Sequence, residues 1–396
     1  MKVALVSAFL EDNVYEHRLT DKFMKDVICK EDHFYHRIAK ALTIRNIEVT
    51  VFYMSQEKEI KEFVHKYGHS IVRVPAKKLK FIHESIVYSP EIINEIRNYD
   101  ICQFVSGYYV KYKIPDMFDY IVKKLNGEMP IIARWAGGNH KWLFPIRKTI
   151  KKNTLNKCEN IICSGKDEIK VLQNIFKIPN EKITYLVNPI NFDLFKERDR
   201  EEALERVGLE KDKKYFLYVG RLSKNKGIEE MLNVFKILVS EYKNLKLIII
   251  GDGPLLEYIK NVVKKNNLEL DVLLIGRLSH EIACYYYNLA SVLINVGHSG
   301  GLANVIIEAM ASNLPIIATD VGASKEFVGE KFKNGILIKL GNELELKKAL
   351  ITILENNEDF RNYNKEKLEQ FTHENFGEKM NGIYEQCLNN SNKYNS

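Results

Sequence analysis

The feature of this sequence that most restricts its fold is a regular alternation of short apolar runs with amphipathic helical segments. In the first half the apolar runs occupy residues 3–8, 49–53, 71–72, 101–105, 130–134, 160–163 and 183–186. In the second half they occupy residues 215–219, 245–250, 272–275, 292–295, 315–319 and 335–338. Such alternation is typical of parallel β-α-β units. We therefore expect an α/β fold of two Rossmann-like, doubly wound lobes that face each other across a cleft.

The length of 396 residues also favours two domains, because one hydrophobic core seldom organises a chain of this size. Residues 188–214 are charged, contain no strand and hold one short helical pattern at residues 201–207. The linker therefore begins at the start of this stretch. We expect a first lobe over residues 1–190, a second over residues 191–370, and a helix with a polar tail over residues 371–396 that packs back on the first lobe.

The first ten residues are apolar, but the run stops at Glu11 and Asp12 without a small-residue cleavage site. They read as a buried first strand and not as a signal peptide. No stretch approaches the roughly 20 apolar residues that span a bilayer. The six cysteines form no C-x-x-C pair and lie in apolar segments, which favours reduced core thiols over a metal site. We expect a cytoplasmic protein.

Positive charge is concentrated in the first half of the chain. Residues 1–190 hold 31 Lys and Arg against 22 Asp and Glu, whereas the remainder holds 28 against 30. This excess suggests contact with an anionic partner, such as phospholipid headgroups or a phosphorylated acceptor, although a solvated lysine-rich surface explains it equally well. Residues 141–157 contain no acid and resemble an interfacial membrane helix. The alternative is ordinary packing of their apolar face inside the lobe.

The strongest local signal is the segment YVGRLSKNKG at residues 218–227, where a strand enters a glycine-flanked loop that precedes a helix. A helix start supplies free amide groups, and Arg221 and Lys226 add positive charge, so the segment is suited to phosphate. Two surface cations in an ordinary turn are the alternative. The turn Gly251-Asp252-Gly253-Pro254 follows the next strand, and we interpret it as structural.

A glycine-rich loop at residues 297–304 leads into a helical segment that carries one acid, Glu308, among apolar neighbours. Free amides at the start of that helix suit a phosphate or a sugar hydroxyl, and the carboxylate one turn later could accept hydrogen bonds from a ribose diol. The alternative for Glu308 is a solvated helix residue.

These segments resemble glycosyltransferase family 4, the retaining group-1 transferases. The resemblance rests on G-R-L-x-x-x-K-G, G-D-G-P, N-V-I-I-E-A-M-A and P-I-I-A-T-D-V-G-A-S-K-E, which follow one another in the family's order between residues 188 and 326. Weaker likeness covers residues 36–42 and 48–51. Residues 186–191 with Phe195 resemble the family segment that closes the first lobe.

The resemblance implies a metal-independent retaining hexosyltransferase of the GT-B fold, with an acceptor-binding first lobe and a nucleotide-sugar-binding second lobe. Arg221 and Lys226 would neutralise the departing diphosphate, and Glu308 would hold the ribose. The other residues expected to bind the nucleotide sugar are Gly220, Arg277, Gly301, Leu302, Ala303 and Asn304. We expect no metal and no cofactor, a UDP- or GDP-sugar donor, and a glycan or lipid-linked acceptor in polysaccharide or glycolipid biosynthesis. Nucleic acid is not an expected partner, whereas peripheral membrane contact is.

The sequence departs from the family pattern at two positions. Gly300 stands where the family usually has an acid, eight residues before Glu308, and Ala136 stands where it often has a histidine. Asn139 or His140 could substitute from the same loop on the donor-sugar or acceptor side. Because of these departures, a non-catalytic nucleotide-sugar-binding protein remains an alternative. Among enzymes the nearest alternative is a GT-B sugar-nucleotide epimerase, against which the G-R-L-x-x-x-K-G loop argues.

Overall fold

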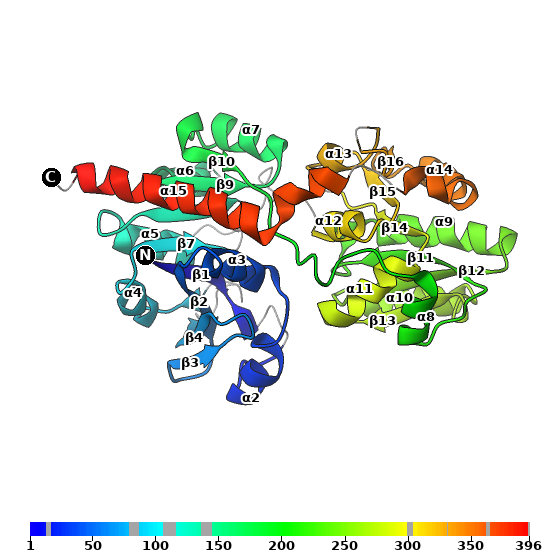
Figure 1. Ribbon diagram of the computed structural model, residues 1–396, viewed down its shortest axis with the longest axis horizontal. Helices are drawn as coiled ribbons and strands as arrows, with labels where there is room; N and C mark the ends of the chain where they lie inside the picture. Colours follow the sequence, from blue (N-terminus) through cyan, green and yellow to red (C-terminus); the bar gives the residue numbers. More distant parts are fainter. Residues whose placement is uncertain are drawn as a thin grey trace. The chain divides into compact units, whose positions relative to one another are not determined.

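The computed structural model describes residues 1–12, 17–78, 87–105, 116–135, 145–298, 304–330, 332–361 and 365–394. The chain forms two units, each with its own sheet (Figure 1). Unit 1 comprises Met1–Pro189 together with Phe371–Ser396, and unit 2 comprises Ile190–Gln370. The first boundary thus lies one residue before the expected one. The segment ending at Phe195, expected to close the first lobe, continues into unit 2.

An eight-stranded sheet forms the centre of unit 1, in the order β10-β9-β8-β7-β1-β2-β4-β3. Its strands are parallel to their neighbours except for the antiparallel pair β3 and β4. The strands are β1 (Lys2–Leu10), β2 (Glu48–Ser55), β3 (Lys61–Val64), β4 (Ser70–Pro75), β7 (Ile101–Phe104), β8 (Ile131–Trp135), β9 (Asn160–Cys163) and β10 (Ile183–Tyr185). A separate antiparallel pair consists of β5 (Lys77–Lys78) and β6 (Val87–Tyr88).

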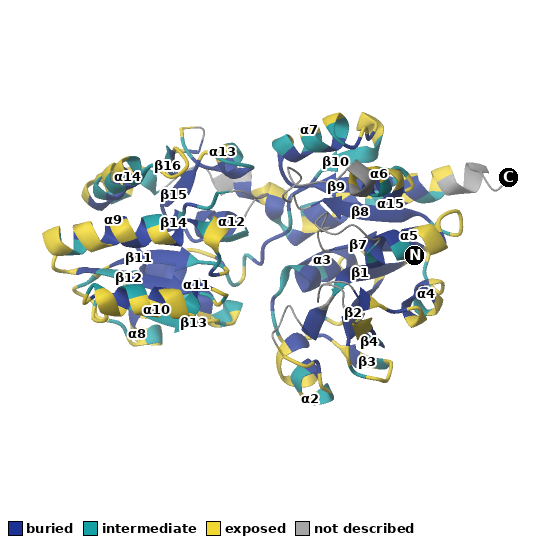
Figure 2. Cartoon of the chain, turned by 180° about the vertical axis from the view of Figure 1, so that it is seen from behind, coloured by how far each residue is buried: buried dark blue, intermediate teal, exposed yellow. Residues whose placement is uncertain are grey.

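Helices cover both faces of this sheet because successive side chains of a strand point to opposite faces. Val3 and Leu5 of β1 belong to one core, whereas Ala4 and Val6 belong to the other. Figure 2 shows the strands buried between helices whose outer faces are exposed. The helices are α2 (Asp21–Phe23), η1 (Met24–Ile28), α3 (Phe34–Thr43), α4 (Glu91–Ile96), α5 (Met117–Leu125), α6 (Pro145–Asn156), α7 (Lys166–Asn174), η3 (Asn180–Lys182) and α15 (His373–Tyr394).

The C-terminal helix α15 belongs to unit 1. Phe376 and Tyr384 lie in the same core as Val3 and Leu5, and the Tyr384 hydroxyl donates a hydrogen bond to the Gln103 side chain. The helix is 22 residues long, well beyond the stretch around residues 380–387 expected from the sequence. The sequence pattern underestimated the length of α15 because only one side of the helix packs against the core, and the polar residues of the other side interrupt the apolar pattern.

Unit 2 contains a six-stranded, fully parallel sheet in the order β13-β12-β11-β14-β15-β16. The strands are β11 (Lys214–Val219), β12 (Leu245–Ile250), β13 (Val272–Gly276), β14 (Val292–Asn295), β15 (Ile316–Thr319) and β16 (Gly335–Ile338). Each overlaps an apolar run of the sequence. These two sheets, one fully parallel and one parallel except for β3, are flanked by helices and confirm the expected pair of doubly wound lobes.

The helices of unit 2 follow the strands one by one. They are α8 (Arg200–Val207), η4 (Lys224–Lys226), α9 (Ile228–Glu241), α10 (Leu256–Lys265), α11 (His280–Leu289), α12 (Asn304–Ala311), α13 (Ser324–Phe327), α14 (Glu343–Glu355), η5 (Asn357–Phe360) and η6 (Lys365–Phe371). Helices α9, α10 and α14 share a core with Phe216 and Tyr218 of β11.

Two expectations about the whole chain are tested by burial and helix length. All six cysteines are buried and free, which confirms reduced core thiols. Within the part of the chain that the structure describes, no helix combines the length and the apolar character needed to cross a membrane.

Candidate active site

The loop that follows β11 joins the end of this strand to the start of α9. The switch point of a parallel sheet lies where connections leave neighbouring strands in opposite directions, and β11 lies between β12 and β14 at that place. Gly227 precedes α9 in the left-handed conformation, with φ of 67°. No side chain among the described residues caps this helix, so its first amide groups are available to an anionic ligand.

Arg221 and Lys226 both lie in this loop. Arg221 is exposed and Lys226 is half-buried. Among the described residues, neither side chain has a hydrogen-bonding or ion-pair partner. Partial burial lowers the pKa of Lys226 below its ordinary value, because the ammonium group has lost water without gaining a counter-charge. Two cations and a helix start, all without a partner side chain among the described residues, form a site suited to an anion with more than one charge.

The loop that follows β12 packs directly against the loop that follows β11. A Cβ atom on Gly251 would lie 1.9 Å from the Gly220 carbonyl oxygen, so only glycine permits this approach. The Leu222 amide donates to the Asp252 carbonyl at 2.8 Å, and the Leu255 amide donates to the Leu222 carbonyl at 3.0 Å. The interpretation of residues 251–254 as a structural turn is therefore confirmed, since these contacts hold the loop after β11 in place.

The loop that follows β14 packs against the loop after β11 on the side opposite the loop after β12, because β11 lies between β12 and β14 in the sheet. A Cβ atom on Gly227 would lie 2.1 Å from the Val296 carbonyl oxygen, and the His298 amide donates to the Asn225 carbonyl at 2.8 Å. The His298 Nε2 atom lies 2.6 Å from Glu230 Oε1 on the first turn of α9. The sequence analysis did not predict the pair of His298 and Glu230. The one feature that could have indicated it is the presence of a histidine within a glycine-rich loop. The loops after β11, β12 and β14 thus form one edge of unit 2.

Glu308 lies on α12 and is buried, so its interpretation as a solvated helix residue is wrong. Its Oε2 atom accepts a hydrogen bond of 2.7 Å from the Tyr287 hydroxyl, and its Oε1 atom lies 4.0 Å from His280 Nε2. The ring of Phe195 packs edge-on against both Tyr287 and His280. The Tyr287 hydroxyl orients the carboxylate, and Phe195 packs behind Tyr287 and His280. Neither Tyr287 nor His280 was identified from the sequence, whereas Phe195 was named only as part of the segment expected to close the first lobe.

The remaining candidates divide into those that the structure describes and those that it does not. Arg277 is exposed and follows β13, on the same edge of the sheet as Gly220 and Arg221. Asn304 is the first residue of α12. Outside the described residues lie Asn139, His140, Gly301, Leu302 and Ala303, together with the departures at Ala136 and Gly300.

The basic segment at residues 141–157 differs from an interfacial helix over its described part. Lys151 of α6 is fully buried and forms ion pairs with Asp116 at 3.0 Å and Asp119 at 3.2 Å. Leu155 belongs to the core of unit 1. This half of the segment therefore packs as an ordinary helix of the lobe, because paired carboxylates neutralise the lysine that faces inward.

Two family models match this chain. The model described as Glycosyltransferase Family 4 matches residues 33–194, and the model described as Glycosyl transferases group 1 matches residues 199–370. The chain belongs to glycosyltransferase family 4. The family that the motifs indicated is thereby confirmed, and the matches extend through both units.

Curated relatives of this family 4 glycosyltransferase align with part of their length. One is N-acetylgalactosamine-N,N'-diacetylbacillosaminyl-diphospho-undecaprenol 4-alpha-N-acetylgalactosaminyltransferase of Campylobacter jejuni, 32% identical over 205 residues, covering 50% of this chain and 52% of the relative. Another is alpha-monoglucosyldiacylglycerol synthase of Streptococcus pneumoniae, 24% identical over 245 residues, covering 60% and 54%. The chain spans about half the length of these relatives.

Solved structures show the same fold at low sequence identity. Sucrose-phosphate synthase from Thermosynechococcus elongatus has a TM-score of 0.75 at 18% identity, covering 98% of both chains. HepE of Anabaena in complex with UDP and glucose has a TM-score of 0.72 at 14% identity, covering 96% of this chain and 98% of that one. These likenesses confirm the GT-B fold class of the family 4 glycosyltransferase.

Proposed function

We propose that this family 4 glycosyltransferase moves a sugar from a nucleotide diphosphate sugar to a hydroxyl group of an acceptor. The observation that carries the proposal is the pair Arg221 and Lys226, two cations without a described protein partner at the start of α9. A diphosphate supplies the missing negative charge. Lys226 is half-buried and its pKa is lowered, so a bound anion would supply the counter-charge that this ammonium group lacks among the described residues.

The transfer breaks the bond between the anomeric carbon and the diphosphate oxygen and forms a bond from that carbon to the acceptor oxygen. Negative charge grows on the departing diphosphate, where Arg221 and Lys226 stabilise it. The acceptor proton passes to the departing phosphate oxygen on the same face of the sugar, which retains the anomeric configuration. Two fixed cations and the amides of α9 supply the charge that a divalent metal supplies in other enzymes, so the reaction needs no metal.

The nucleotide binds at the edge of unit 2 that the loops after β11, β12 and β14 form. Glu308 accepts hydrogen bonds from the ribose hydroxyls, held in place by Tyr287. Gly220 and Arg277 contact the nucleotide from the ends of β11 and β13. The amides of Gly301, Leu302, Ala303 and Asn304 contact the sugar and phosphates, and Asn139 and His140 serve the donor-sugar or acceptor side.

The donor we favour is a UDP-hexose and the acceptor a glycan or lipid-linked glycan. The names of the two relatives mention diphospho-undecaprenol and monoglucosyldiacylglycerol, and HepE is solved with UDP and glucose. A lipid-linked acceptor fits a cytoplasmic enzyme held peripherally at the inner face of the membrane. Exposed Lys123, Lys124 and Lys148 contribute to the excess of positive charge in unit 1 that such binding uses.

The experiment that tests the proposal has two steps. A thermal-shift screen against UDP, GDP and their sugars identifies the donor, because a ligand at 100 times its Kd stabilises the protein by about 2.7 kcal/mol. The radiolabelled donor is then incubated with lipid-linked and free glycan acceptors. We expect labelled product only when an acceptor is present. Nucleotide release at the same rate without any acceptor would indicate an epimerase or hydrolase, and binding without release would indicate a binding protein.

A further inference from the structure

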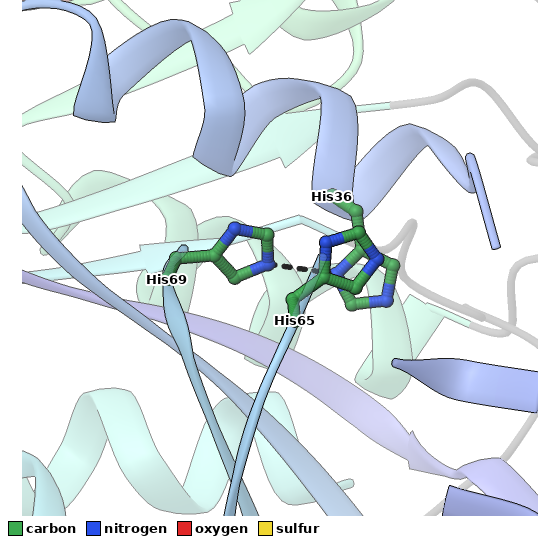
Figure 3. Close-up of side chains that lie close together, drawn as sticks. All are labelled: His36, His65 and His69. Carbon is green, nitrogen blue, oxygen red and sulfur yellow. Dashed lines mark hydrogen bonds between the residues drawn. The ribbon is translucent and has the colours of Figure 1, made fainter. Parts of the chain in front are cut away.

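Three buried histidines gather in unit 1, away from the residues assigned to the transfer reaction. His36 lies on α3, His65 follows β3, and His69 precedes β4 (Figure 3). One ring nitrogen from each lies within 4.8 Å of those of the other two. The His65 amide donates to the His69 carbonyl at 3.0 Å across the turn, so the turn presents both rings to the helix.

The spacing and the chemistry of these residues suit a transition metal. His65 and His69 form an H-x3-H pair, which falls within the ligand spacing of zinc sites. The ring atoms of His36 and His69 approach closely, with 2.9 Å between Nδ1 and Nε2. Imidazole nitrogens favour zinc, copper, nickel and cobalt over magnesium or calcium.

His36 and His69 offer lone pairs because burial disfavours their charged form. Burial lowers the pKa of His36 well below its ordinary value and lowers that of His69 to about 3, and the neighbouring His65 acts in the same direction on both. A neutral ring is the form that binds a metal, so at neutral pH no proton has to leave these two rings before an ion binds.

The surrounding polar groups resemble those that orient metal-binding histidines. The Nδ1 atom of His65 accepts from the Tyr67 amide at 3.1 Å, so its Nε2 atom donates to the Glu31 carbonyl at 2.9 Å. The Tyr53 hydroxyl lies 3.1 Å from His36 Nε2. A carbonyl or hydroxyl group on the second ring nitrogen fixes the tautomer in such sites.

One buried nitrogen of the cluster has no hydrogen-bond partner. This atom is His69 Nδ1, which neither donates nor accepts a hydrogen bond among the described residues. An ion bound by His36 Nδ1 and His69 Nε2 would replace the hydrogen bond between these atoms, and His69 would then carry its proton at Nδ1. The protein therefore leaves the cluster only partly satisfied by its own groups.

We propose that His36, His65 and His69 bind one zinc-class divalent ion that ties α3 to the β3–β4 hairpin. The His36 and His65 rings are stacked with centroids 4.0 Å apart. A tetrahedral ion holds nitrogens at about 2.0–2.1 Å and hence about 3.3–3.5 Å from one another. Binding therefore rotates the His65 ring toward the other two and releases the Tyr67 amide. The ion acts as a structural clamp on an edge strand, and the transfer reaction does not use it.

Metal content and thermal stability test the site. We expect protein purified without chelator to hold one equivalent of zinc by mass spectrometry. Zinc added to metal-free protein at 100 times its Kd should raise the unfolding midpoint by about 5–10 °C, and magnesium should not. Cobalt should give the visible absorption of a tetrahedral nitrogen-ligated ion, a measurement that needs no variant.

Variants assign the effect to the cluster. His69→Asn should abolish both the zinc shift and the cobalt spectrum. The matched control is His373→Asn, which removes a buried histidine of the same unit outside the cluster and should retain both. A wild-type protein without a cobalt spectrum would overturn the proposal, even if His69→Asn failed to fold. So would an equal zinc shift in wild type and His69→Asn.

Discussion

Replacing Lys226 with methionine should slow turnover strongly and stabilise the protein. The ammonium group is half-buried and has no counter-charge among the described residues. Two unit charges 4 Å apart attract by about 4 kcal/mol at an effective dielectric constant near 20. Loss of one electrostatic donor commonly raises the activation barrier by about 2.7–4 kcal/mol. We therefore expect kcat to fall by about 10²–10³-fold in Lys226→Met.

The effect on stability has the opposite sign. Burial lowers the pKa of Lys226 in the folded state below the ordinary value of 10.5, so its charge disfavours folding at neutral pH. This cost is present below the folded-state pKa and disappears as the pH rises through 10.5, where the lysine is neutral in both states. Lys226→Met should therefore unfold at a higher temperature than wild type at pH 7, and the difference should shrink as the pH approaches 10.5.

Initial rates at saturating donor and acceptor, together with thermal unfolding at pH 7 and pH 10, check both parts. The matched control is Lys224→Met, because Lys224 lies two residues earlier in the same turn but is exposed. It should change neither kcat nor stability appreciably. A kcat of Lys226→Met within threefold of wild type would refute the assignment of this lysine to the diphosphate, and so would an equal loss in Lys224→Met.

Four further outcomes are expected. Glu308→Gln should weaken the nucleotide diphosphate by about tenfold or more in a calorimetric titration, since a hydrogen bond to a charged acceptor contributes about 1.5–3 kcal/mol, and a 2′,3′-dideoxy analogue should bind both proteins alike. Gly251→Ala should unfold at a clearly lower denaturant concentration than Gly276→Ala, because its methyl group meets a backbone oxygen at 1.9 Å whereas none lies within 4 Å of Gly276. Burial lowers the pKa of His373 to about 4, so between pH 6.5 and pH 4 the His373 imidazole binds a proton in the unfolded chain but not in the folded protein. Between pH 7.5 and pH 5 the free energy of unfolding of wild type should therefore fall by about 2 kcal/mol more than that of His373→Asn, as measured by denaturant titration. EDTA added at the start of the assay should leave the initial rate within twofold of its untreated value, and a lost rate that magnesium restores would contradict metal-independent transfer.

The sequence by itself determined the two mainly parallel sheets and the cation-bearing loop after β11. Both are encoded locally: an apolar run of strand length followed by a helical pattern specifies a β-α unit, whichever residues pack against it. The segment 218–227 also shows a strand end, glycines and cations in ten consecutive residues directly before a helix. Strands β11 to β16 therefore lie where the apolar runs predicted them.

Structural features that have no local sequence pattern were not predicted from the sequence. The edge strand β3 has only one buried residue among its four, so it shows no apolar run. Lys151 belongs to a basic segment whose lysines were expected to be solvated, yet its side chain is buried and paired with Asp116 and Asp119. The sequence pattern did not indicate these pairs because the two acids lie more than thirty residues earlier in the chain.

Contacts between distant residues were decided by tertiary structure alone. Glu308 meets Tyr287 across 21 positions, and His36 meets His69 across 33. Each partner by itself looks like an ordinary polar residue of a helix or turn. Periodicity tells which face of an element is buried, but it does not tell which other element covers that face. The orientation of the Glu308 carboxylate and the gathering of three histidines therefore arise only when the sheets bring their helices and turns together.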